Sequence, residues 1–260
     1  MDPLERSTYL AAEARKSDPD RYLCALFAPA ERRNAVLGLV LFHHELARVA
    51  EIVSQPMAGL IRYQWWREAV AEAAAGQPPR QHPVVLELVT ALDRGWVDEA
   101  RLVALIDARE PALERLGASD PAELEAFATA TSGALQALIY RALGGEDAAE
   151  ESAARAIGTA LGLVGMARAL GLELEQQLPP HQDESLRRPR AEVASIVGVL
   201  TARSSALVGE GRRAAGHPAR AWMAAFLPAS LTTAYPGQLQ RERSPLAPLA
   251  LGLRFLLRRP

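Results

Sequence analysis

The chain has a single cysteine, no excess of positive charge and no apolar run long enough to cross a membrane. One cysteine excludes an internal disulfide framework and a cysteine-based zinc site, and the apolar run around Cys24 predicts a buried thiol. The formal net charge of -2 is untypical of a protein that binds nucleic acid, whose surface is normally basic. The segment 245–257 is shorter than the roughly 18 residues that a membrane helix needs, and Pro248 and Arg254 interrupt it.

The first residues lack the features of a targeting segment. Residues 1–6 have neither the basic start nor the apolar stretch of a secretory signal, and their acidic residues are untypical of an organelle transit peptide. We therefore expect a cytoplasmic protein.

Apolar residues make up 49% of the chain and extend from end to end without a polar linker, which predicts one domain over residues 1–260. Nearly every segment has helical periodicity, with proline and glycine at the predicted helix ends, and no segment reads as a strand. The sequence therefore predicts an all-α fold, a bundle of about eight to ten helices. The predicted helices are about 18–28, 30–53, 57–75, 83–94, 98–109, 119–143, 147–174, 190–215, 218–234 and 247–257, with a loop at 176–189.

Several short motifs, in a specific order and spacing, resemble the squalene and phytoene synthases. They are the short helix that ends at Pro29, Phe-His-His-Glu-Leu-Ala at 42–47, Ile-Arg-Tyr-Gln-Trp-Trp-Arg at 61–67, His-Pro-Val at 82–84, and the segments 127–133 and 158–164. Together they cover about residues 20–175. The resemblance implies a single helical bundle of the isoprenoid (terpenoid) synthase type.

Active members of that family release pyrophosphate from a prenyl diphosphate, a step that requires Mg²⁺ to neutralise the leaving group. Two Asp-x-x-x-Asp pairs supply the oxygen ligands, because carboxylates four residues apart share one helix face. At the first pair, Ala47 takes the first aspartate position, or Arg48 if the register slips by one, and only Glu51 is left for the second. Glu45 precedes this window.

At the second pair, Arg168 matches the family pattern, Ala169 replaces the first aspartate and Glu173 replaces the last. No aspartate lies between Asp20 and Asp93 or between Asp147 and Asp183, so a shift in alignment does not restore either pair. We therefore expect no catalytic residues, no metal site and no cofactor. The alternative is a Mg²⁺-dependent prenyl-diphosphate synthase that uses Glu45, Glu51 and Glu173 as a reduced ligand set.

One branch of the family is more similar: the assembly factor of mitochondrial respiratory complex I and its bacterial relatives, which share the motifs at 42–47 and 61–67. This resemblance implies a pseudoenzyme that acts as an assembly or binding factor with a protein partner in respiratory complex biogenesis. The missing transit peptide favours a bacterial member. A third hypothesis is an isoprenoid or lipid carrier that uses the family's apolar cavity.

The remaining candidate residues each have a structural alternative. Arg62, Gln64, Trp65, Trp66 and Arg67 are candidates for lining the cavity or binding an anion, together with Arg48 and Arg168. Alternatively, the tryptophans pack in the core and the arginines form ion pairs with Glu45, Glu51 and Glu68. The adjacent His43 and His44 point about 100° apart on a helix, which disfavours a shared metal ion.

The C-terminal segment 245–260 combines leucines and a phenylalanine with three arginines. Such a segment is typical of a helix that lies on an anionic membrane surface, and equally of a helix that closes the bundle. On the first alternative we expect peripheral contact with the inner face of the cell membrane.

Overall fold

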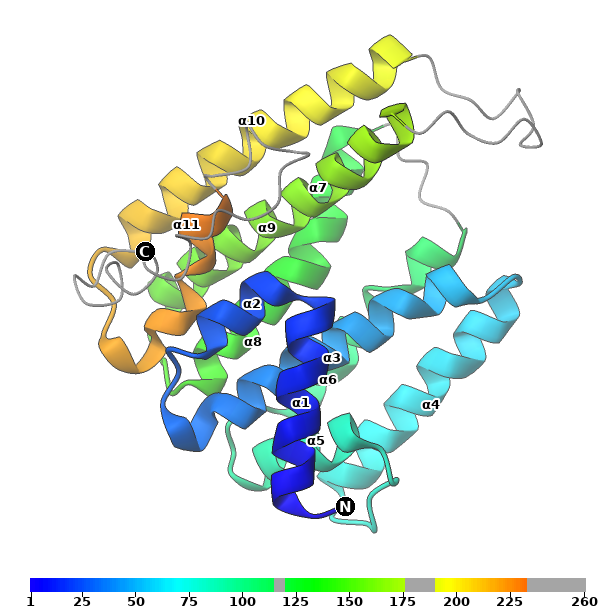
Figure 1. Cartoon of the computed structure of the whole chain (residues 1–260), viewed down its shortest axis with the longest axis vertical. Coiled ribbons are helices and arrows are strands. Elements are labelled where there is room, and N and C mark those ends of the chain that lie inside the picture. Colours follow the sequence, from blue (N-terminus) through cyan, green and yellow to red (C-terminus); the bar gives the residue numbers. More distant parts are fainter. Residues whose placement is uncertain (115–119, 176–189, 233–260) are drawn as a thin grey trace.

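The computed structural model describes residues 1–114, 120–175 and 190–232, and helices make up most of them (Figure 1). No β-strand occurs in these ranges, which confirms the predicted all-α fold. The α-helices are α1 (Pro3–Ser17), α2 (Pro19–Ala25), α3 (Ala30–Ile52), α4 (Pro56–Ala74), α5 (Pro83–Asp93), α6 (Glu99–Asp107), α7 (Pro121–Ala128), α8 (Ala134–Ala142), α9 (Ala148–Glu175), α10 (Arg190–Ala215) and α11 (Pro228–Thr232). Shorter turns are the 3₁₀ helices η1 (Glu110–Glu114) and η4 (Arg220–Ala225) and the π-helix η2 (Thr129–Gly133).

Proline and glycine mark many of the helix boundaries, as the sequence predicts. A proline opens six helices, where its missing N–H costs no hydrogen bond: Pro3, Pro19, Pro56, Pro83, Pro121 and Pro228. The side chains of three aspartates accept hydrogen bonds from backbone N–H groups at the starts of α2, α6 and α7: Asp18, Asp98 and Asp120. Glycines with positive φ follow α4, α5, α8 and α10: Gly76, Gly95, Gly144 and Gly216.

Three segments differ from the predicted elements. Helix α1 is absent from the prediction, although Asp2 and Glu5 form a capping box around its first turn. The predicted helix 119–143 is interrupted by the π-turn η2, which changes its hydrogen-bonding period. The predicted helix 218–234 consists of η4 and α11, because Pro228 disfavours helical backbone in the residue before it. The predicted loop at 176–189 and helix at 247–257 lie outside the described residues.

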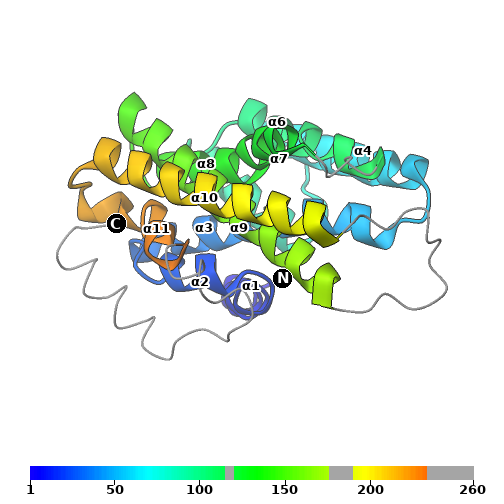
Figure 2. The same ribbon diagram turned by 90° about the horizontal axis from the view of Figure 1, so that it is seen from above.

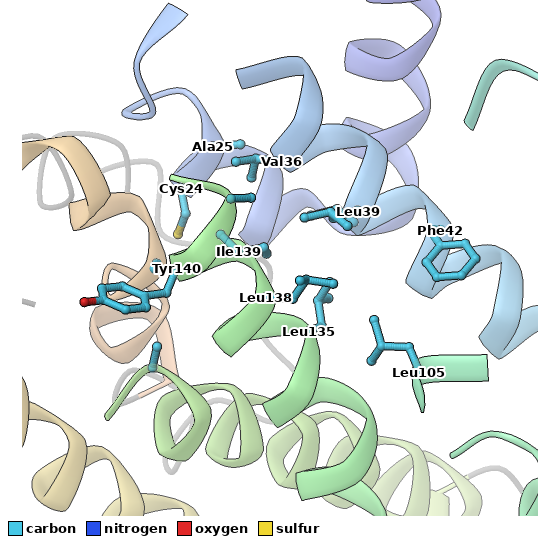
Figure 3. Close-up of a cluster of buried hydrophobic side chains, with 14 of the residues drawn as sticks. Cys24, Ala25, Val36, Leu39, Phe42, Leu105, Leu135, Leu138, Ile139 and Tyr140 are labelled. Carbon is cyan, nitrogen blue, oxygen red and sulfur yellow. The ribbon is translucent and has the colours of Figure 1, made fainter. Parts of the chain in front are cut away.

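Helix α3 crosses the middle of the bundle and packs against α1, α5 and α8. Its residues 35–42 are all buried, which explains why this stretch of the sequence is almost continuously apolar. Figure 3 shows Val36, Leu39 and Phe42 of α3 directed toward side chains of α8 and α6. Cys24 of α2 belongs to the same core with 3% of its surface exposed, and the predicted buried thiol is confirmed.

Helices α9 and α10 lie side by side (Figures 1 and 2), and α9 also packs against η2 and α8. By length and composition alone, residues 148–171 of α9 and 190–215 of α10 would be able to cross a membrane. A core helix has the same composition, and more than half of the α9 window is buried in the protein. The apolar character of α9 is therefore explained by packing inside the bundle.

Candidate functional site

A cavity of about 840 Å³ opens where five parts of the chain meet. The junction of α1 and α2 contributes residues 17–21, and α3 contributes His43, Ala47 and Glu51. Arg109 lies just after α6, and further lining residues come from the end of α7 and from η2. The C-terminal half of α9 completes the lining with Leu161, Gly162, Val164, Gly165, Met166, Arg168 and Ala169.

Both positions that the sequence analysis identifies as vacated aspartates line this cavity. Ala47 lies on α3 and Ala169 on α9, and Glu51 and Arg168 from the same two motifs accompany them. The structure therefore brings together two motifs that are far apart in the sequence. Glu45 does not line the cavity and pairs with Arg48, with 3.8 Å between Oε1 and Nη1. Glu173 belongs to α9, and its side chain lies outside the described residues.

The Arg21 guanidinium is held in a buried hydrogen-bond network at the cavity wall. Its Nη1 donates to Asp18 Oδ2 at 2.8 Å, its Nη2 to Ser132 Oγ at 2.7 Å and its Nε to Gln136 Oε1 at 3.2 Å. Ser132 Oγ in turn donates to the carbonyl of Gly158 on α9. Charge-assisted bonds of this kind fix both the side chain and the neighbouring helices. Arg21 thus links α2 to η2 and α8, a role that the sequence alone does not reveal.

A second arginine, Arg109, contacts His43, with 2.6 Å between Nη2 and Nε2. Burial lowers the pKa of Arg109 to about 10, so its guanidinium stays charged at neutral pH. Burial, followed by the charges of Arg109 and Arg21, lowers the pKa of His43 well below its usual value. His43 is therefore a neutral hydrogen-bond acceptor, and Arg21, Arg109 and Arg168 give the cavity three cationic side chains.

The π-turn η2 positions two hydroxyl side chains in the wall of the cavity. Thr131 and Ser132 are both buried and both line it. A π-turn inserts one extra residue into a helix and is frequent at functional sites. Nothing in the helical periodicity of this segment signals the extra residue.

Comparison with known proteins places the chain in a family. The model of the squalene/phytoene synthase family matches residues 14–257. The chain belongs to the squalene/phytoene synthase family.

Solved structures of synthases have the same fold. A dehydrosqualene synthase crystallised with a ligand superposes with a TM-score of 0.73 at 14% identity, covering 98% of this chain and 96% of the other. Squalene synthase HpnC from Alicyclobacillus acidocaldarius gives a TM-score of 0.67 at 18% identity, covering 98% and 97%. At these identities the likeness shows the isoprenoid synthase type of fold, as the sequence predicts.

Curated relatives with higher sequence identity than these two structures are named as assembly factors and not as synthases. NADH dehydrogenase (ubiquinone) complex I, assembly factor 6, from Homo sapiens is 38% identical over 155 residues, which are 60% of this chain and 46% of the relative. The Drosophila melanogaster homologue is 28% identical over 173 residues, 63% of this chain and 50% of the relative. The chain thus spans about half the length of the curated relatives that it matches.

The carboxylates that line the cavity do not fit a cluster of Mg²⁺ ions. Three carboxylates line it: Asp18, which is engaged by Arg21, the buried Asp20, and Glu51, which is the one predicted ligand position that brings a carboxylate to the described lining. The described residues contain no group of three or more His, Cys, Asp or Glu side chains that would hold a metal ion. Arginines on the same wall also repel a divalent cation. The described lining therefore does not match the ligand set of a Mg²⁺-dependent synthase.

The described lining of this cavity does not include the α4 candidates Arg62, Gln64, Trp65, Trp66 and Arg67. Trp66 packs edge-on against Phe42, and Trp65 lies against Trp66 and under Arg80. These contacts confirm the alternative of core packing.

The polar side chains of the same helix are engaged elsewhere or exposed. Arg67 pairs with Asp107 at 2.6 Å and with Glu110, and neither partner is among the predicted ones. Gln64 donates to Glu68 at the surface, and Arg62 is exposed. Helix α4 packs against α5 and α6.

Proposed function

We propose that this chain is an assembly factor for respiratory complex I that uses the synthase cavity to bind a ligand and not to ionise a prenyl diphosphate. The observation that carries the proposal is the cavity itself: it is open, and three arginines line it together with Ala47 and Ala169, which the resemblance to the family assigns to the aspartate positions. The relatives named as complex I assembly factors support the biological role.

The composition of the cavity favours an anionic, partly apolar ligand. Phe127, Leu161 and Val164 line one part of it and offer apolar contacts. Arg109 and Arg168 lie in the same lining and would bind a phosphate group directly, because a guanidinium matches the geometry of an oxyanion. An isoprenoid phosphate or a phospholipid has both parts.

A deletion strain tests the role in assembly. We expect loss of the gene to reduce assembled NADH:ubiquinone oxidoreductase in native gels of membranes, with carotenoid and hopanoid content unchanged. Unchanged complex I together with altered isoprenoid products would contradict the proposal and would support the prenyl-diphosphate synthase. Complementation with the wild-type gene is the positive control.

The role of the cavity is tested by Arg168→Gln, with Arg62→Gln as the matched control. Arg168 lines the cavity, whereas Arg62 is exposed and lies outside the lining. We expect Arg168→Gln to lower complementation and Arg62→Gln to complement fully, at equal protein levels. Equal complementation by both variants would show that the role in assembly does not depend on the cavity.

The enzyme alternative has a direct assay. Glu51 lines the cavity and is the one carboxylate of the predicted reduced ligand set that the described lining retains. We expect no Mg²⁺-dependent pyrophosphate release from farnesyl or geranylgeranyl diphosphate by the purified protein. Release that Glu51→Gln abolishes would establish a synthase. Native mass spectrometry of the same preparation would detect a co-purified lipid, as the carrier hypothesis predicts.

A further inference from the structure

A second pocket, of about 630 Å³, lies apart from the synthase cavity and shares none of its lining residues. It is bordered by the first turn of α3, the connection between α5 and α6, the end of α8 and the connection between α8 and α9. Arginine is the most frequent side chain in the described lining, with Arg32, Arg94, Arg101 and Arg141, against two carboxylates, Asp98 and Glu146. The pocket is therefore locally basic in a chain whose formal net charge is -2.

Two of the four guanidiniums are neutralised inside the protein. Arg101 pairs with Asp98 at 2.7 Å and with Glu151 at 3.5 Å. Arg141 pairs with Glu151 at 3.2 Å and donates to the carbonyl of Gly145. These two side chains are therefore held in position by ion pairs within the protein.

The other two, Arg32 and Arg94, have no ion pair within residues 1–114, 120–175 and 190–232. Both lie near the ring of Trp96, with 4.9 Å from Arg32 Cζ and 6.0 Å from Arg94 Cζ to its centroid. Arg32 Nη1 also donates to the carbonyl of Ala142 at 2.7 Å. The Trp96 ring and the Ala142 carbonyl thus orient the Arg32 side chain. Because a guanidinium has five N–H donors, Arg32 keeps further donors for a ligand.

The backbone beside Arg32 keeps the pocket accessible. Gly144 has φ of 98°, a conformation that other residues rarely adopt, and a Cβ at this position would lie 3.4 Å from Arg32 Nη1. Glycine therefore allows the chain to pass close to the guanidinium. The combination of oriented arginines without an ion pair and close backbone is typical of sites that bind phosphate groups.

We propose that this pocket binds a phosphoryl group through Arg32 and Arg94, with the aromatic face of Trp96 holding the two guanidiniums in position. The phosphoryl group belongs either to a small soluble ligand or to a lipid headgroup. The proposal is independent of the proposed function, because it uses no residue of the synthase cavity.

The test measures binding of inorganic pyrophosphate by calorimetry and binding of phosphatidylcholine vesicles with and without phosphatidic acid. We expect Arg94→Gln to weaken binding at least about threefold, and Arg32→Gln with Arg94→Gln to weaken it about tenfold or more, because each change removes charge-assisted hydrogen bonds. Arg94 is exposed and contacts the fold through the Trp96 ring, so the single variant keeps the fold even if the double variant does not.

Two controls locate the site. Arg62→Gln removes an exposed arginine elsewhere, and Arg168→Gln removes one from the synthase cavity; we expect both variants to bind through this pocket as the wild type does. If Arg94→Gln loses binding of pyrophosphate, the pocket takes a small soluble ligand. If Arg94→Gln loses only the increase in vesicle binding that phosphatidic acid causes, the pocket takes a lipid headgroup. The proposal is overturned if neither probe binds the wild type, or if the Arg94 variant binds both probes unchanged.

Discussion

Arg109 and His43 form a hydrogen bond across the wall of the synthase cavity, with 2.6 Å between Nη2 of the guanidinium and Nε2 of the imidazole. A guanidinium donates only, so Nε2 of His43 accepts and its proton resides on Nδ1. Protonation of His43 would remove this acceptor and place a third positive charge beside Arg109 and Arg21. The contact therefore requires neutral histidine.

This relationship predicts that acid destabilises the protein through His43. Burial and the two arginines lower the native pKa of His43 well below its usual value, so the unfolded chain takes up a proton that the native state does not. Native stability is thus lost as pH falls below about 6.5, by up to roughly 1.4 kcal/mol per pH unit until the native pKa is reached. Urea unfolding at about pH 7.5 and about pH 5.5 measures the loss.

His43→Gln keeps an acceptor without a titrating group. We expect this variant to lose less stability than the wild type over the same pH interval. His217→Gln is the matched control, because His217 is exposed after the end of α10, and we expect it to retain the pH dependence of the wild type. An equal pH dependence in the wild type and His43→Gln would show that His43 does not contribute.

A second prediction concerns the close crossing of α9 over η2 and α8. A Cβ at Gly158 would lie 2.5 Å from the backbone oxygen of Ser132 and would also collide with Gln136 Cβ. Because neither atom can move without shifting the backbone, we expect Gly158→Ala to destabilise the fold by about 3 kcal/mol. Gly198→Ala on α10 meets no atom within 4 Å and should stabilise the protein by about 0.5 to 1 kcal/mol. Chemical denaturation compares the two, and similar values for both variants would contradict the tight crossing.

The sequence predicts the fold well, because helical period, proline and glycine place most of the helices. The assignment of Ala47 and Ala169 to the aspartate positions rests on the resemblance to the family and stays a prediction. The structure adds that both residues line one cavity.

Arg21, Arg109 and His43 are not predictable as a group. They come from α2, from the residues just after α6 and from α3, and only the tertiary fold brings them to one cavity. The candidates Arg62, Gln64, Trp65, Trp66 and Arg67 are absent from the described lining of the cavity. Their aromatic and basic character suits a ligand site as well as a core, and only the packing of Trp66 against Phe42 distinguishes the two.

The lost carboxylates lead to a third prediction, on metal binding. Ala47, Glu51 and Ala169 line one cavity, so Ala47→Asp combined with Ala169→Asp would add two carboxylates to the Glu51 carboxylate that the motif positions already bring to the lining. We expect Mg²⁺ to raise the melting temperature of this double variant and to leave that of the wild type unchanged. At a Mg²⁺ concentration of about ten times the dissociation constant, the stabilisation is about 1.4 kcal/mol, or about 3 °C.

The control must add the same charge outside the cavity. Ala71→Asp with Ala194→Asp does so, because Ala71 and Ala194 are exposed on α4 and α10. We expect no Mg²⁺ response from this pair. A response in the wild type equal to that of the cavity variant would mean that the native residues already bind the ion, which would support the synthase alternative. A response in neither would mean that carboxylates at positions 47 and 169 are not sufficient to offset the repulsion of the cation by Arg21, Arg109 and Arg168 in the same lining.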